Sequence, residues 1–264
     1  MDNNFIKSFY RNSCNEDERL LSRSGNIEFI TTMSYIHKYL ENNLQSRILE
    51  VGAGTGRYSI ALADEGYQVD ALELVEENLA VLKSKIKPEY HMSAEQGNAL
   101  DLSRYEDETY DLTLVLGPMY HLFTENEKKT VLKEAIRVTK KKGIIMVAYC
   151  MNEATVLQYM FGQGHIADYV KNNRVTSDFK CVSEPSEIFD LMRVEDIEKI
   201  NLGMDATREK LIASDGASMY MEDMLKRLTD EEYNLFIEYH LKTCERQDLI
   251  GATNHALDIL RKCD

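Results

Sequence analysis

The chain has 264 residues, of which 44% are hydrophobic and 29% are charged. These proportions are typical of a globular protein and exclude disordered and fibrous classes. The length is sufficient for one large domain with a full hydrophobic core. The formal net charge of −14 repels phosphate backbones and anionic lipid head groups, so it disfavours a nucleic-acid or membrane partner.

The cysteines are scattered along the chain and form no C-x-x-C pair, and they show no metal-ligand spacing with the histidines. We therefore predict neither a disulfide scaffold nor a bound metal. The first ten residues lack the apolar segment of a signal peptide, and no stretch approaches the ~18 apolar residues that span a bilayer. We expect a reduced, cytoplasmic protein without a membrane span.

Residues 1–45 carry apolar side chains at helical spacing, as in Ile27, Ile30, Met33 and Ile36. The pattern predicts a helical lead-in. From Arg47 onwards it changes to short apolar segments that alternate with longer amphipathic ones, which is typical of βα units and a parallel sheet. Residues 46–150 are thus the predicted core.

Within this core the apolar segments predict strands over 47–51, 68–74, 91–97, 110–116 and 143–150. The amphipathic segments predict helices over 56–65, 76–86 and 125–140. Lys142 and Gly143 form the stop signal expected after the last of these helices.

After Cys150 the regular alternation weakens, and residues 151–205 are predicted to be an insertion with helices over 152–172 and 194–200. Residues 206–264 follow with a strand over 207–214, a helical pair over 219–246 and a final strand over 253–261. We interpret the whole chain, 1–264, as a single domain.

A glycine-rich turn from Gly52 to Gly56 follows the first core strand and leads into a helix. Glycines at alternate positions allow a ligand to lie close to the backbone and to the helix N-terminus. Such turns serve NAD, FAD and adenosyl-sulfonium ligands, and some are only tight turns.

Two residues favour a cationic adenosyl ligand over a dinucleotide. The dinucleotide motif G-x-G-x-x-G would need a glycine at position 57, which is Arg57. Glu50 precedes the turn, where its carboxylate would attract an ammonium or sulfonium group and repel a pyrophosphate. Glu73, near the end of the second strand, can accept both ribose hydroxyl protons, which suits either class.

Taken together, residues 50–56, Glu73, 97–102 and 110–117 resemble, in order and spacing, the motifs of class I S-adenosylmethionine-dependent methyltransferases. The resemblance covers residues 46–150. It implies an α/β fold with a doubly wound, mostly parallel seven-stranded sheet of the Rossmann-like type, whose final strand is antiparallel. It also implies S-adenosylmethionine as the cofactor and S-adenosylhomocysteine as its product.

The resemblance further implies a role for each motif. The turn would pass under the methionine part of the cofactor, Glu73 with Leu74 would bind the ribose, and the segment after the third strand would flank the adenine. The end of the fourth strand would border the active site. The residues that take these roles are Glu50, Gly52, Ala53, Gly54, Thr55, Gly56, Glu73, Leu74, Asn98, Ala99, Leu116 and Gly117. Asn98 stands where many relatives have Asp, and its amide oxygen can still accept a hydrogen bond.

Tyr120 and His121 follow the fourth strand, at the expected position of the transferred methyl group. His121 could be a catalytic base or could orient the substrate, and a purely structural histidine is the alternative. Tyr10 and Arg11 could close over the ligand as a lid. His240 and His255 lie on regular helix and strand patterns and are interpreted as packing residues.

The sequence therefore predicts an enzyme that transfers a methyl group from S-adenosylmethionine to a small molecule, acting as a monomer or homodimer. The alternatives are an RNA or protein methyltransferase, a nicotinamide-dependent oxidoreductase, and a non-catalytic adenosyl-ligand-binding protein. The sequence does not identify the methyl acceptor.

Overall fold

The computed structural model describes residues 22–185 and 188–264. Tyr10, Arg11 and Cys14 lie outside the described residues. The predicted helical lead-in is represented by helix α3, Arg23–Leu40, which begins after the N-cap Ser22, whose side chain accepts a hydrogen bond from the backbone of Gly25.

A seven-stranded sheet forms the centre of the molecule, with the strand order β3-β2-β1-β4-β5-β7-β6. All neighbouring strands from β3 to β5 pair in parallel, and β7 is antiparallel to both β5 and β6. The sheet confirms the predicted fold class. The strands are β1 Arg47–Val51, β2 Gln68–Glu73, β3 Met92–Gln96, β4 Tyr110–Val115, β5 Thr139–Cys150, β6 Ala206–Ala213 and β7 His255–Lys262.

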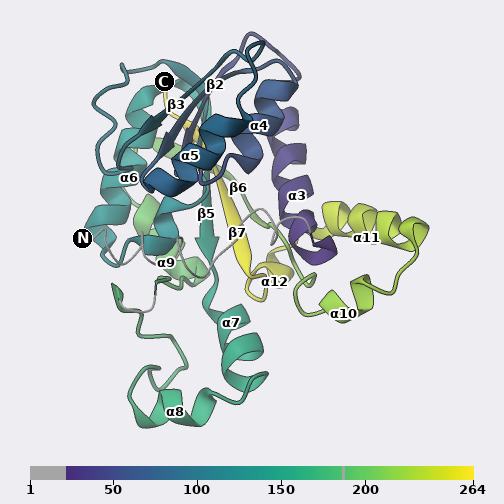
Figure 1. Ribbon diagram of the computed structural model, residues 1–264. Coiled ribbons are helices and arrows are strands. Elements are labelled where there is room, and N and C mark those ends of the chain that lie inside the picture. The colour runs from purple at the N-terminus through teal and green to yellow at the C-terminus, as the bar shows by residue number, and fades with distance from the viewer. Residues whose placement is uncertain (1–21, 186–187) are drawn as a thin grey trace.

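Helices cover both faces of the sheet (Figure 1). On one face, side chains such as Ile36 of α3 and Leu62 of α4 pack with Ile48 of the sheet. On the other face, Leu132 of α6 and Ile197 of α9 pack around Leu49. Besides α3, the helices of these layers are α4 Arg57–Asp64, α5 Glu76–Lys85, α6 Glu125–Val138 and α9 Val194–Asn201.

The junction between α6 and β5 differs from the prediction. The helix ends at Val138, and β5 begins at Thr139 rather than at Gly143. The register to β4 shifts between Tyr110 and Leu112, and Lys142 has a φ of 61°. Residues 140–142 therefore form an irregular start of a strand, where Lys140 forms an ion pair with Asp111, and Lys142 and Gly143 do not follow a helix directly.

The insertion is less regular than the predicted helix over 152–172. It forms α7 Asn152–Thr155, then one stretch of π-helix, η2 Val156–Phe161, and then α8 Ile166–Lys171. The break falls at Gly162 and Gly164, and the latter has a φ of 79°, which is favoured by glycine. Two helical arms project from the sheet in Figure 1, one with α7 and α8 and one with α10 and α11.

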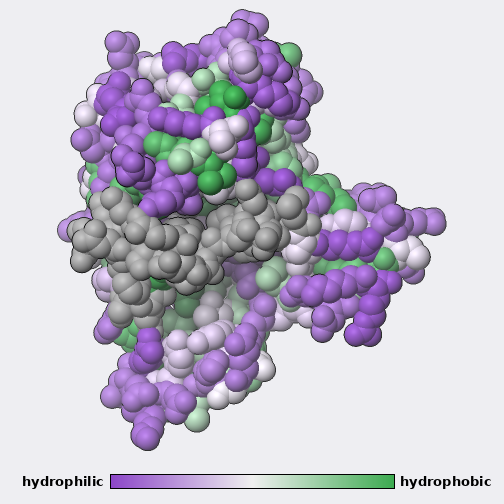
Figure 2. All heavy atoms as spheres, viewed as in Figure 1, coloured by the Kyte–Doolittle hydropathy of each residue, from purple (hydrophilic) through white to green (hydrophobic). Residues whose placement is uncertain are grey.

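The C-terminal part contains α10 Glu222–Leu225, α11 Asp230–Thr243 and α12 Gln247–Ile250 before β7. Hydrophilic side chains predominate on the face shown in Figure 2, including the projecting α11. No helix in residues 22–185 and 188–264 is long and apolar enough to cross a membrane.

Candidate active site

The glycine turn after β1 joins three strand ends at one edge of the sheet. The backbone amides of Gly52 and Ala53 both donate to Leu72 O at the end of β2, at 2.7 and 3.0 Å. A Cβ on Gly52 would lie 2.6 Å from Cδ of Pro118, just beyond β4, and a Cβ on Gly56 would lie 2.2 Å from Leu82 of α5. These two glycines are therefore required by the packing of neighbouring segments.

Gly54 lies in a different environment. It has a φ of +56°, and an added Cβ would have no atom of residues 22–185 or 188–264 within 4 Å. Its amide donates to Oε2 of Glu73 at 2.8 Å. The backbone between Ala53 and Thr55 thus borders open space, which a ligand can occupy against the turn. The carbonyl of Thr55 accepts a hydrogen bond from Lys85 Nζ at 3.0 Å, which fixes the far side of the turn.

Glu73 connects the turn to the next two segments. Its Oε1 accepts from the amide of Val75 at 2.8 Å, and its backbone carbonyl accepts from Gly97 at 3.0 Å. The side chain is 5% exposed, and this burial raises the pKa of the carboxyl group. The neighbouring Leu74 is partly exposed at the same edge.

Asn98 and Ala99 follow Gly97 directly. Oδ1 of Asn98 accepts from the backbone amide of Leu100 at 3.0 Å, so the side chain closes its own turn. Ala99 packs against the core and is partly exposed. A carbonyl oxygen has two lone pairs, so the predicted contact of Asn98 with an adenine amino group stays compatible with this geometry.

Glu50 lies beneath helix α4 and is only 2% exposed. Its carboxyl group accepts a hydrogen bond from the Ser59 hydroxyl. Burial raises the pKa of Glu50 to about 8, although Ser59 opposes this shift. Burial therefore disfavours the charged form of Glu50. Its predicted attraction for a cationic ligand remains a prediction.

The end of β4 lies against the glycine turn. A Cβ on Gly117 would be 3.2 Å from the carbonyl oxygen of Gly52, so the two backbones are in near contact. The adjacent Leu116 packs with the α3 and α4 side of the core. From β1, the chain adds β2 and β3 on one side of the sheet and then β4 on the other side. Ligands of open α/β sheets bind where the strand order changes direction in this way.

The predicted catalytic pair lies on the short 3₁₀ helix η1, Pro118–His121. Tyr120 and His121 are each 8% exposed. Nδ1 of His121 is 2.8 Å from the carbonyl oxygen of Ile188, and the backbone carbonyl of Tyr120 accepts from Asp190 at 2.7 Å. A carbonyl only accepts, so Nδ1 of His121 carries the proton in this contact.

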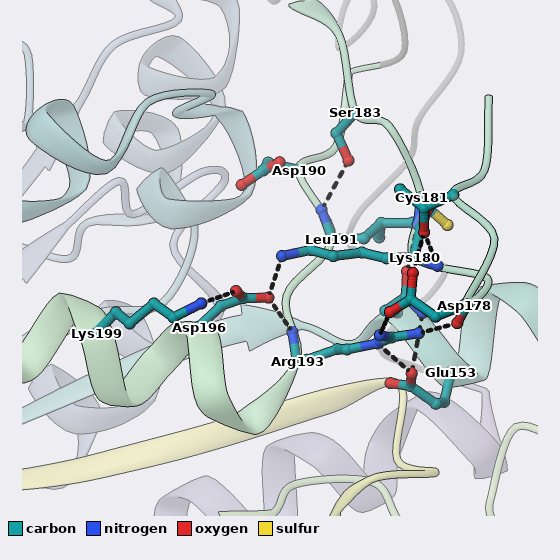
Figure 3. A network of polar contacts seen from close by, with 12 residues as sticks. Glu153, Asp178, Lys180, Cys181, Ser183, Asp190, Leu191, Arg193, Asp196 and Lys199 are labelled. Atoms are coloured by element: carbon teal, nitrogen blue, oxygen red, sulfur yellow. Dashed lines mark hydrogen bonds and ion pairs between the residues drawn. The ribbon is translucent and has the colours of Figure 1, made fainter. Parts of the chain in front are cut away.

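Tyr120 and His121 of η1 therefore contact the insertion through Asp190 and Ile188. The insertion also contains a network of charged side chains (Figure 3). Arg193 donates from Nε to Glu153 at 2.7 Å and from Nη1 to Asp178 at 2.6 Å. Asp196 accepts from the backbone amide of Arg193 at 3.1 Å and forms an ion pair with Lys180 at 2.6 Å. This network joins α7, the following loop and α9.

One cluster at the same edge was missed by the sequence analysis. Glu28 of α3, Asp215 after β6 and His255 at the start of β7 bring their side chains within 4.8 Å of one another. The ring of Tyr120 lies 5.8 Å from that of His255. The three residues are far apart in the chain and form no local motif. Asp215 and His255 lie beside the ends of predicted strands, but Glu28 lies in the predicted helical lead-in, and no pattern connects it to them.

Most predicted cofactor residues therefore lie at one edge, joined by direct backbone or side-chain contacts. The open space above Gly54, the adjacent Glu73 carboxylate and the turn without a third dinucleotide glycine fit an adenosyl ligand with a charged amino-acid part. No residue role is tested directly by this geometry, so the individual assignments remain predictions.

Comparison with known proteins gives a matching family model, described as a methyltransferase domain, over residues 48–143. A putative methyltransferase YqeM from Bacillus subtilis is 27% identical over 111 residues, covering 41% of this chain and 45% of that protein. A ubiquinone biosynthesis O-methyltransferase from Rickettsia typhi is 26% identical over 180 residues, covering 65% and 67% respectively.

Among solved structures, a SAM-dependent methyltransferase from Thermotoga maritima, described as a possible histamine N-methyltransferase, superposes with a TM-score of 0.54 at 16% identity. That match covers 98% of this chain and 99% of the other, and it supports the fold. The chain spans about half the length of the first curated relatives that it matches, with 45% and 52% of those proteins aligned.

Proposed function

We propose that the chain, whose residues 48–143 match a methyltransferase domain, transfers a methyl group from S-adenosylmethionine to a small molecule. The observation that carries this proposal is the open space above Gly54, bordered by the carboxylate of Glu73. The methionine part would lie against the turn, the ribose hydroxyls would donate to Glu73, and the adenine would lie beside Asn98 and Ala99.

S-adenosylmethionine supplies an electrophilic methyl group on a sulfonium. A nucleophile of the acceptor attacks the methyl carbon in line, and the bond to sulfur breaks with its electron pair left on sulfur. The protein must align the reacting atoms and exclude water. Leu116, Gly117 and Tyr120 would border the space where the acceptor meets this methyl group.

Two observations support a small acceptor over RNA. The net charge of −14 opposes a polyanion, and a matched relative bears the name of an O-methyltransferase of ubiquinone biosynthesis. The insertion from 151 to 205 and helix α3 would cover the acceptor. The described cysteines are free thiols, which supports a reducing, cytoplasmic environment.

The test uses S-adenosylmethionine with a tritiated methyl group and three separate acceptor pools. These pools are the small-molecule filtrate of a cell extract, total RNA, and denatured protein. We expect label in the small-molecule pool alone, and its loss when Glu73 is replaced by Ala. Label only in RNA or protein would contradict the proposed acceptor class. Cofactor binding without label in any pool would indicate a non-catalytic adenosyl-ligand-binding protein.

A further inference from the structure

Outside the predicted cofactor residues, Glu28, Asp215 and His255 form a cluster of ionisable side chains at the sheet edge. Asp215 is 1% exposed. Its Oδ1 accepts from the hydroxyl of Thr253 at 2.5 Å and from the amides of Asn254 and His255 at 3.0 and 3.1 Å. These donors fix the carboxylate in one orientation.

The other oxygen of Asp215 sets the state of the imidazole. Oδ2 lies 2.8 Å from Nδ1 of His255, so the ring donates its Nδ1 proton to the carboxylate. In the neutral ring the basic nitrogen is then Nε2. No hydrogen-bond partner for Nε2 lies among the described residues, and the His255 side chain is 16% exposed. A fixed carboxylate that orients one imidazole nitrogen and leaves the other available is the arrangement of an acid–base histidine.

The charges around the ring favour its protonated form. Oε2 of Glu28 approaches Nδ1 from α3 at 3.5 Å, and Cys150 of β5 is paired directly opposite His255 in the sheet. Burial lowers the pKa of His255, but the electrostatic effect of its neighbours, led by the Glu28 carboxylate, outweighs it, and the pKa lies well above its usual value. His240, buried on α11, contacts the same loop through the carbonyl of Ser214 and has a lowered pKa because of burial.

The position of the cluster relates it to the proposed site. His255 begins β7 opposite the carboxyl end of β5, at the edge that also carries the glycine turn, and its ring lies 5.8 Å from that of Tyr120. Glu28 precedes Phe29, whose ring lies 4.2 Å from the guanidinium of Arg57 at the start of α4. The same helix therefore contacts both the cluster and the segment that follows the glycine turn.

We propose that Nε2 of His255, oriented by Asp215 and Glu28, accepts the proton that the methyl acceptor gives up during transfer. This inference rests on the proposed function. The acceptor atom forms its bond to the methyl carbon, the carbon–sulfur bond breaks towards sulfur, and the proton of the acceptor passes to the neutral imidazole and then to water. Such a base is needed only when the nucleophile carries a proton, so the acceptor is a hydroxyl, thiol or N–H compound.

The test follows the ring itself and requires no identified acceptor. Two-dimensional NMR of protein labelled with ¹⁵N-histidine gives the pKa and the tautomer of His255, whose signals are those missing in His255→Gln. We expect a raised pKa, an Nδ1–H tautomer in the neutral form, and a lower pKa in Glu28→Gln, because one carboxylate beside the imidazolium is removed. His240→Gln is the control, and it should leave the His255 pKa nearly unchanged.

Methyl transfer to the small-molecule pool tests the catalytic step. The rate should rise with pH through the pKa of His255, because only the neutral ring accepts a proton, and the rise should move to lower pH in Glu28→Gln. His255→Gln should lose at least tenfold in rate and keep its affinity for S-adenosylhomocysteine.

The outcomes separate this inference from the proposed function. An Nε2–H tautomer, a ring still charged at pH 10, or an unchanged pH profile in His255→Gln would overturn the role of His255 even if methyl transfer occurs. Transfer absent from every pool would instead count against the proposed function, and the tautomer and the pKa shift would still decide whether the base is correctly arranged.

Discussion

Gly52, Gly54 and Gly56 alternate along one turn, but a side chain at each would meet different surroundings. Added atoms at Gly52 and Gly56 would collide with Pro118 and Leu82, whereas the same atom at Gly54 would meet none of the described side chains. The spacing of the motif does not distinguish these roles, because it is set by the backbone of the turn. The structure assigns the ligand-facing position to Gly54 and the packing positions to the other two.

Gly54→Ala tests this assignment. An alanine at a φ of +56° should lower the stability by about 1 kcal/mol, and its methyl group would occupy the space above the turn. We expect a folded protein whose affinity for S-adenosylhomocysteine falls at least tenfold, measured by calorimetry. Gly203→Ala is the matched control, since Gly203 also has a positive φ, +77°, and open space around its Cβ position. Equal affinities in the two variants would disprove the assignment.

At the scale of elements, the strands and the core helices could be predicted well, because each apolar segment is long enough to show its period. The strand β2, for example, was predicted over 68–74 and spans Gln68–Glu73. The insertion could not be predicted in the same way. Its path depends on contacts such as Arg193 with Glu153, 40 residues earlier in the chain, which no local pattern encodes.

Arg193→Lys probes how this insertion is held. A guanidinium can reach Glu153 and Asp178 together, whereas a single ammonium group cannot match that geometry. Asp178 is largely exposed, so we expect only a small loss in stability, with faster proteolysis between residues 176 and 183. Arg246→Lys, which alters an exposed pair with Asp248, is the control. Identical digestion patterns for both variants would show that Arg193 does not hold the insertion.

At the scale of the whole molecule, the sheet order places the predicted cofactor motifs at one edge, where the strand order changes direction between β1 and β4. The sequence predicts this shared position of the cofactor motifs, because the carboxyl ends of parallel strands lie at the same edge of a sheet. The charged cluster of Glu28, Asp215 and His255 did not follow from it, since its members come from a helix, a loop and the last strand. His255 was interpreted as a packing residue because its strand pattern carries no information on what lies opposite.

The central claim is that this edge binds an adenosyl cofactor. Calorimetric titration of the purified protein, freed of carried-over ligand, with S-adenosylmethionine, S-adenosylhomocysteine and NADH tests it most directly. Our account predicts binding of both adenosyl compounds and none of NADH, because Arg57 replaces the third dinucleotide glycine. Binding of NADH alone would contradict the account and indicate a redox protein.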